Sequence, residues 1–110
     1  MNISNVKDYT LITTTENSFS DFLNAFKAEK LDESNSHKVV QLSENLNTTL
    51  QDLSLFLDIA TNHKSNGISF VVICNNVDID EVPDEINVVP TLIEAEDVLE
   101  MEAIERDLGF

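Results

Sequence analysis

Cysteine, glycine and histidine are scarce in this chain of 110 residues, and each shortage excludes a class of site. Cys74 is the single cysteine, so no disulfide can form within the chain, and its apolar neighbours predict the end of a buried strand. The two glycines, Gly67 and Gly109, exclude the glycine-rich loops that cradle nucleotide phosphates. The two histidines, His37 and His63, have no partner at metal-ligand spacing, so we expect neither a metal nor another cofactor.

Basic residues are also few: six lysines and arginines against twenty-one aspartates and glutamates give a formal net charge of −15. Such a chain repels phosphate backbones and anionic lipid, so we expect no direct nucleic-acid binding and no membrane association. No apolar run approaches the ~20 residues that span a bilayer, and the start, MNISNVKDYT, lacks the regions of a signal peptide. We expect a soluble, cytoplasmic protein, monomeric or weakly homodimeric, with a basic or neutral protein partner.

Apolar residues are present in quantity, at 42% of the chain, which argues against a disordered protein. The length suits one domain, and we expect residues 1–110 to form it. Apolar runs of strand length, bounded by polar clusters, are typical of β-strands. They occur at residues 9–14, 38–42, 68–74 and 86–89.

Helical periodicity fills the intervals between these runs. The first predicted helix follows Ser18 and places three phenylalanines on one face. The second follows a capping pair, Thr48 and Gln51, and ends at Gly67; the third follows Thr91. Strands that alternate with helices predict an α/β fold, a single-domain sandwich with a mixed sheet of about four to five strands and helices packed mainly on one face.

Residues 38–104 contain, in order, a strand that ends in Leu42-Ser43, a helix, Gly67 before the next strand, and the segment TLIEA at residues 91–95 that opens the last helix. This order gives the segment a resemblance to a STAS domain, the fold of bacterial anti-sigma-factor antagonists. The resemblance implies a regulatory protein-interaction module without enzymatic activity, whose partner is a kinase of the anti-sigma type.

Members of that family carry a phosphorylated serine in a D-S-[ST]-G-[LI] motif at the start of the second helix, where the helix dipole favours a phosphate. The motif falls here on residues 49–53, TLQDL, and only the final leucine agrees. Because Leu50 occupies the acceptor position, we expect a module without the phosphoserine switch. Thr48 and Thr49 are the nearest hydroxyls, and Thr48 is expected to cap the helix.

The start of the second helix is the first candidate partner-binding surface. Its apolar residues exceed what one sheet-facing stripe requires, which favours an additional contact. The candidate residues are Thr48, Thr49, Asp52, Leu53 and Phe56.

The last helix is the second candidate surface, because residues 78–110 hold twelve acids and one base. Its acidic face is represented by Glu96, Glu100 and Asp107, while its apolar residues, Ile104 among them, are expected to face the sheet. In this alternative the protein is an accessory or regulatory subunit recruited to an RNA-processing or other enzyme. A purely solubilising acidic face is the competing interpretation.

The segment 86–110 also resembles that of short, acidic, STAS-like bacterial proteins that sometimes carry a ribonuclease Z label. That enzyme resembles the metallo-β-lactamases, which need an H-x-H-x-D-H motif for two metal ions. Two isolated histidines cannot supply it, so we expect a protein without catalytic activity of its own.

Overall fold

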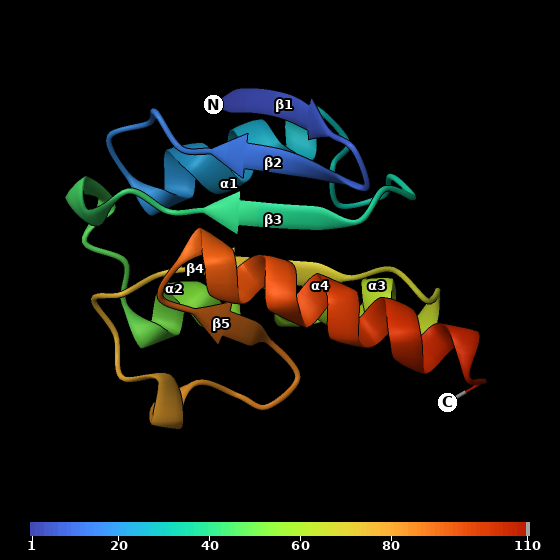
Figure 1. Ribbon diagram of the computed structural model, residues 1–110. Helices are drawn as coiled ribbons and strands as arrows, with labels where there is room; N and C mark the ends of the chain where they lie inside the picture. The colour runs from blue at the N-terminus through green and yellow to red at the C-terminus, as the bar shows by residue number, and fades with distance from the viewer. Residues whose placement is uncertain (110) are drawn as a thin grey trace.

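One mixed sheet of five strands runs through the computed structural model, which describes residues 1–109 (Figure 1). The strands follow chain order across the sheet, and their bounds are β1 (Asn2–Val6), β2 (Tyr9–Thr13), β3 (Lys38–Gln41), β4 (Phe70–Ile73) and β5 (Asn87–Val89). β1 and β2 form an antiparallel hairpin, whereas β2 to β5 run parallel to one another. The predicted runs coincide with β2 to β5, and β1 was not predicted.

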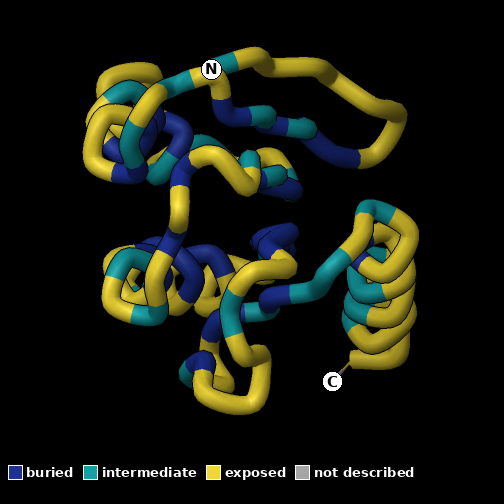
Figure 2. The backbone as a smooth tube through the Cα atoms, turned by 90° about the vertical axis from the view of Figure 1, so that its left-hand side faces the viewer, coloured by how far each residue is buried: buried dark blue, intermediate teal, exposed yellow. Residues whose placement is uncertain are grey.

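Four helices within residues 1–109 cover the two faces of the sheet unequally. Their bounds are α1 (Phe19–Ala28), α2 (Leu50–Ser54), α3 (Leu57–Ser65) and α4 (Leu92–Asp107), and two short 3-10 turns, η1 (Glu44–Leu46) and η2 (Ile79–Glu81), lie in the connections. α1, α2 and α3 lie on one face and α4 lies alone on the other (Figures 1 and 2). The predicted fold class, an α/β sandwich with helices mainly on one face of a mixed sheet, is confirmed.

The central strands β3 and β4 are buried on both sides because helices cover both faces. Val40 and Val72 point toward α1, α2 and α3, whereas Val39 and Val71 point toward α4. All four valines are fully buried. This arrangement explains why both strands appear in the sequence as continuous apolar runs without polar alternation.

Five of the phenylalanines pack together on the face of the sheet that α1, α2 and α3 cover. Phe22 and Phe26 come from α1, as their spacing predicted, and Phe70 comes from β4. The ring of Phe56 lies among them, with its centre 5.3 Å from that of Phe19 and 5.5 Å from that of Phe70. Tilted and edge-to-face pairs add to the energy of burial, so this layer depends on Phe56.

The segment predicted as one helix after Thr48 contains two. α2 ends at Ser54, where the chain tightens into i→i+3 hydrogen bonds donated by the N–H groups of Leu55 and Phe56, and α3 then begins. The tighter turn allows Leu53 and Phe56, three residues apart, both to face the core.

The helix cap in this segment is Thr49 and not Thr48. Thr49 Oγ1 accepts a hydrogen bond from the Asp52 N–H, and the Asp52 carboxylate accepts one from the Thr49 N–H, both at 3.1 Å. The predicted pairing of Thr48 with Gln51 is therefore wrong, because Asp52 stands three residues after Thr49 and returns its bond. Thr48 is buried instead, and its Oγ1 has no hydrogen-bond partner among residues 1–109.

Thr48→Val should raise the free energy of unfolding by about 1 kcal/mol, because it removes a buried hydroxyl without a partner and keeps the shape of the side chain. Chemical denaturation of both proteins measures the difference. Thr48→Ser is the control: it keeps the hydroxyl, deletes a methyl group and should lower the free energy by about 1 kcal/mol. A Thr48→Val protein less stable than the parent would show that the hydroxyl is bonded after all.

Candidate functional site

The residues predicted for the first partner surface do not share an exposed face. Leu53 and Phe56 are fully buried in the core cluster that contains the phenylalanines of α1, and those rings pack around Phe56. Thr48 is buried as well, while Thr49 and Asp52 bond to each other in the helix cap. The expectation of an exposed contact face at Leu53 and Phe56 is therefore wrong. Partner contact through Thr49 and Asp52 stays a prediction.

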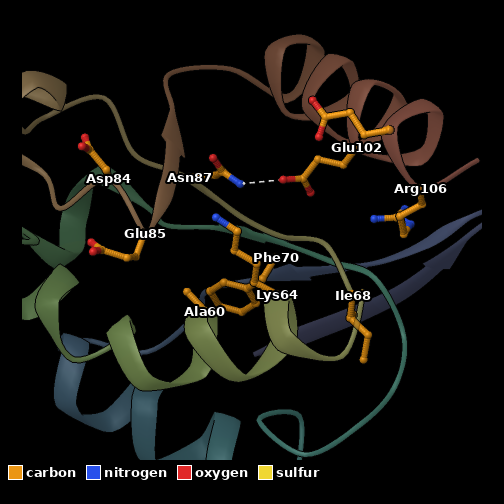
Figure 3. Close-up of a pocket in the computed structure, with 11 residues that line it drawn as sticks. Ala60, Lys64, Ile68, Phe70, Asp84, Glu85, Asn87, Glu102 and Arg106 are labelled. Carbon is orange, nitrogen blue, oxygen red and sulfur yellow. Dashed lines mark hydrogen bonds between the residues drawn. The ribbon is translucent and has the colours of Figure 1, made fainter. Parts of the chain in front are cut away.

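Helix α4 is held on its own face of the sheet by a buried alanine and by polar bonds. Ala95 is fully buried in the apolar cluster that includes residues of β3 and β4. Near the other end of the helix, the Asn87 side chain of β5 donates a hydrogen bond to Glu102 at 3.2 Å (Figure 3). The Arg106 guanidinium donates another to the Ser69 hydroxyl at 3.1 Å. These contacts determine which side of α4 faces solvent.

The solvent side of α4 exposes a line of apolar residues. Ile93 is 73% exposed, Met101 60%, Ile104 52% and Leu108 65%. With about 100° between successive helical residues, these four lie within about 80° of one another, on the side opposite Ala95. We call them the outer stripe. The prediction that Ile104 faces the sheet is wrong, because Ile104 lies half a turn around the helix from Ala95.

Acidic side chains border the outer stripe on both sides, and Asp97 interrupts it, because it lies within the same arc of the helix, four residues after Ile93 and four before Met101. The exposed acids along it are Glu94, Asp97, Glu100, Glu105 and Asp107. Of the three predicted acidic contacts, Glu100 and Asp107 belong to this border. Glu96 lies closer to the sheet, where its carboxylate accepts a hydrogen bond from the Tyr9 hydroxyl at 3.2 Å. Burial and the neighbouring Glu96 raise the pKa of Tyr9.

A groove of 610 Å³ separates α4 from the start of β2 and is lined in part by Glu96, Glu100, His37 and Arg106. His37 Nδ1 accepts a hydrogen bond from the Ser69 N–H at 2.9 Å. Burial, and then the nearby positive charge of Arg106, lower the pKa of His37. The imidazole is therefore neutral at neutral pH and serves as an acceptor for the backbone.

A smaller pocket of 270 Å³ lies between the end of α3, the start of β5 and the second half of α4 (Figure 3). Two cations line it, Lys64 and Arg106, together with the acids Asp84, Glu85, Glu102 and Glu105. Its lining contains no serine, cysteine or histidine that could act as a nucleophile or base. Among residues 1–109, no three His, Cys, Asp or Glu side chains are placed to hold a metal ion.

Lys38 forms a buried polar cluster that sequence reasoning missed, because the residue stands at the head of an apolar run. Its Nζ donates to the carbonyl oxygens of Ser34 (2.9 Å) and Ser36 (2.6 Å) and lies 2.9 Å from His63 Nε2. His63 Nδ1 lies 2.8 Å from the Ile59 carbonyl, which it reaches as a donor, so Nε2 is left as the acceptor for Lys38. Burial lowers the pKa of Lys38 to about 8. The amine is closed to solvent and ties the loop before β3 to α3.

The part of the chain described by the structure contains no helix long and apolar enough to cross a bilayer. No protein-family model and no curated protein matches this chain.

Proposed function

We propose that this protein is a non-enzymatic protein-binding module that docks a cationic, amphipathic helix of a partner on the outer stripe of α4. The observation that carries the proposal is the line of four apolar side chains, each more than half exposed, on a helix whose other exposed residues are largely acidic. The resemblance of residues 38–104 to STAS domains supports a protein-binding role, with an anti-sigma-type kinase or a regulated enzyme as the partner.

The outer stripe has the dimensions of a helix-docking site. From Ile93 to Leu108 it extends about 22 Å along α4, at 1.5 Å per residue, which matches about four turns of a partner helix. Burying an isoleucine, leucine or methionine is worth about 1.5–3 kcal/mol each, so these side chains can supply most of the binding energy.

Charge selects the partner. The acids beside the outer stripe favour lysine and arginine next to the apolar residues of the incoming helix, and the net charge of −15 steers a cation toward the protein. A second copy of α4 is a poor partner, since its own acids would face those of the first copy. This matching of charge favours recruitment through the acidic last helix over the surface at the start of α2.

Binding is constitutive in this proposal. Leu50 cannot accept a phosphate, and the Thr49 hydroxyl already accepts the Asp52 N–H as the cap of α2. In this proposal, salt and protein abundance regulate the complex, and a phosphoserine at the start of α2 does not.

A synthetic cationic helix tests the docking surface. The probe is a fluorescent peptide with leucine at the a and d positions of a heptad and lysine at the others, and fluorescence anisotropy measures its dissociation constant. Met101→Asp combined with Ile104→Asp should weaken binding at least tenfold, or about 1.4 kcal/mol, although the variant is more acidic than the parent.

Matched controls separate docking from simple charge attraction. Ile79→Asp replaces another exposed isoleucine, in η2, and should bind the peptide at least as tightly as the parent. If the double variant of α4 instead binds as tightly as Ile79→Asp, the attraction is purely electrostatic and the outer stripe is not a docking site.

A further inference from the structure

The outer edge of β1 is an unprotected edge of the sheet. All five residues of β1 are exposed, including Ile3 at 45% and Val6 at 38%. Among residues 1–109, no other segment lies beyond β1 in either view (Figures 1 and 2). The strand contains no proline or charge, and its register with β2 is unbroken by a bulge. Proteins normally protect sheet edges with one of these devices, because a bare edge pairs with another strand.

The opposite edge of the sheet is protected. β5 has only three residues, and Pro90 follows it directly. The Asn87 side chain of β5 donates its hydrogen bond to Glu102 of α4. Proline and short length both limit pairing at an edge. β1 is therefore the edge available for an additional strand.

The register of the β1–β2 hairpin determines which backbone groups β1 directs outward. Val6 and Tyr9 close the two-residue turn, so Val6, Ser4 and Asn2 exchange hydrogen bonds with β2. Ile3 and Asn5 alternate with them, and their N–H and C=O groups point away from β2. The N–H of Thr10, the residue opposite Asn5, supports this assignment. It donates to the His37 carbonyl oxygen on the β3 side of β2, so Thr10 and Asn5 do not exchange backbone hydrogen bonds.

We propose that β1 pairs antiparallel with β1 of a second copy of this chain, about a two-fold axis at Ser4. In this register Ile3 of each copy lies opposite Asn5 of the other, and their outward N–H and C=O groups form four backbone hydrogen bonds. The two five-stranded sheets then continue into one. Ile3 of the two copies become diagonal neighbours on one face, within reach of each other.

A second copy suits this edge better than another extended chain for two reasons. Under a two-fold axis, the outward N–H and C=O groups of Ile3 in one copy meet those of Asn5 in the other. The same strand therefore supplies both halves of the interface. Residues 1–6 also contain no acid in a chain of net charge −15, so two copies can approach there without opposing carboxylates at the contact. The interface is small, which gives a weak dimer whose formation increases with salt, because salt screens the remaining repulsion.

Sedimentation velocity tests the association. The parent should change from monomer to dimer between about 10 µM and about 1 mM, and at lower concentration in about 0.5 M salt. Asn5→Pro removes one outward N–H and leaves the backbone bonds between β1 and β2 intact, although the long bond from the Thr10 hydroxyl to the Asn5 side chain is lost, so it should abolish the dimer. Ile93→Lys on α4 is the control and should still dimerise. Circular dichroism verifies that each variant is folded.

Oxidative crosslinking tests the register. In a Cys74→Ser background, whose hydroxyl can keep the bond to Asn76, Ser4→Cys places two thiols directly opposite each other. It should form an intermolecular disulfide at least tenfold faster than Ile3→Cys or Asn5→Cys, because neither of these lies opposite its own copy. A parent that stays monomeric at about 1 mM in high salt would overturn the proposal, as would equal crosslinking rates at the three positions. Neither outcome affects the docking surface on α4.

Discussion

Phe56→Ala should lower the free energy of unfolding by about 3–5 kcal/mol, a large fraction of the stability of a domain of this size. Phe56 is fully buried, and its ring lies within 6.5 Å of those of Phe19, Phe22, Phe26 and Phe70, measured between centres. Alanine would leave a cavity at the centre of this layer. Chemical denaturation followed by circular dichroism measures the loss.

The residue directly before it provides the control. Leu55 is 53% exposed, so Leu55→Ala should change the free energy of unfolding by less than about 0.5 kcal/mol. Comparable losses for the two variants would contradict the structure, because they would mean that the chain turns differently between α2 and α3. A Phe56→Ala loss below about 1 kcal/mol would restore the earlier expectation that this residue lies on a contact face.

The stability of the protein should depend on the titration of Lys38. The pKa of Lys38 is about 8 in the folded chain and has its ordinary value of 10.5 when the chain is unfolded. Between these values the unfolded chain binds more protons, so the free energy of unfolding rises with pH across this window. The full penalty of burying the ammonium is present below pH ~8 and disappears above pH ~10.5, a change of about 3 kcal/mol.

Lys38→Met isolates this effect, because it keeps the aliphatic stem and removes the titrating group. The free energy of unfolding of the parent should rise relative to that of the variant by about 2–3 kcal/mol between pH ~7.5 and pH ~10.5. Cys74 and Tyr9, whose pKa values burial raises, act in the opposite direction in both proteins and cancel in the difference. A difference that is flat with pH would show that the Lys38 ammonium is well solvated.

Much of the fold could be predicted, because local signals agreed with the tertiary structure. Ser18 caps α1 and Thr91 caps α4, each by accepting the N–H three residues later. The apolar runs became β2 to β5 because both faces of the inner strands are covered. β1 could not be predicted, because all five residues of this edge strand, NISNV, are exposed, and a strand that buries no side chain has no pattern of apolar residues.

The candidate site could be predicted only in part. The acids of the last helix were recognised, but apolar residues occur on two sides of α4, and periodicity alone could not assign Ile104 to the outer one. Lys38 gave no sign of its burial, since its partners come from the preceding loop and from α3. Thr48 and Thr49 both satisfied the capping rule, and only the position of Asp52 decided between them.

The fold class, the positions of β2 to β5 in the chain, the starts of α1 and α4 and the acidic character of the last helix could be predicted, because each depends on residues close together in the chain. The burial of Leu53 and Phe56, the exposure of the outer stripe of α4 and the open edge at β1 depend instead on how distant elements pack in the folded chain. Burial and exposure are properties of what packs against a residue, and the packing elements here come from distant parts of the chain. The surfaces available to partners are therefore the outer stripe of α4, which faces away from the sheet, and the free edge of β1.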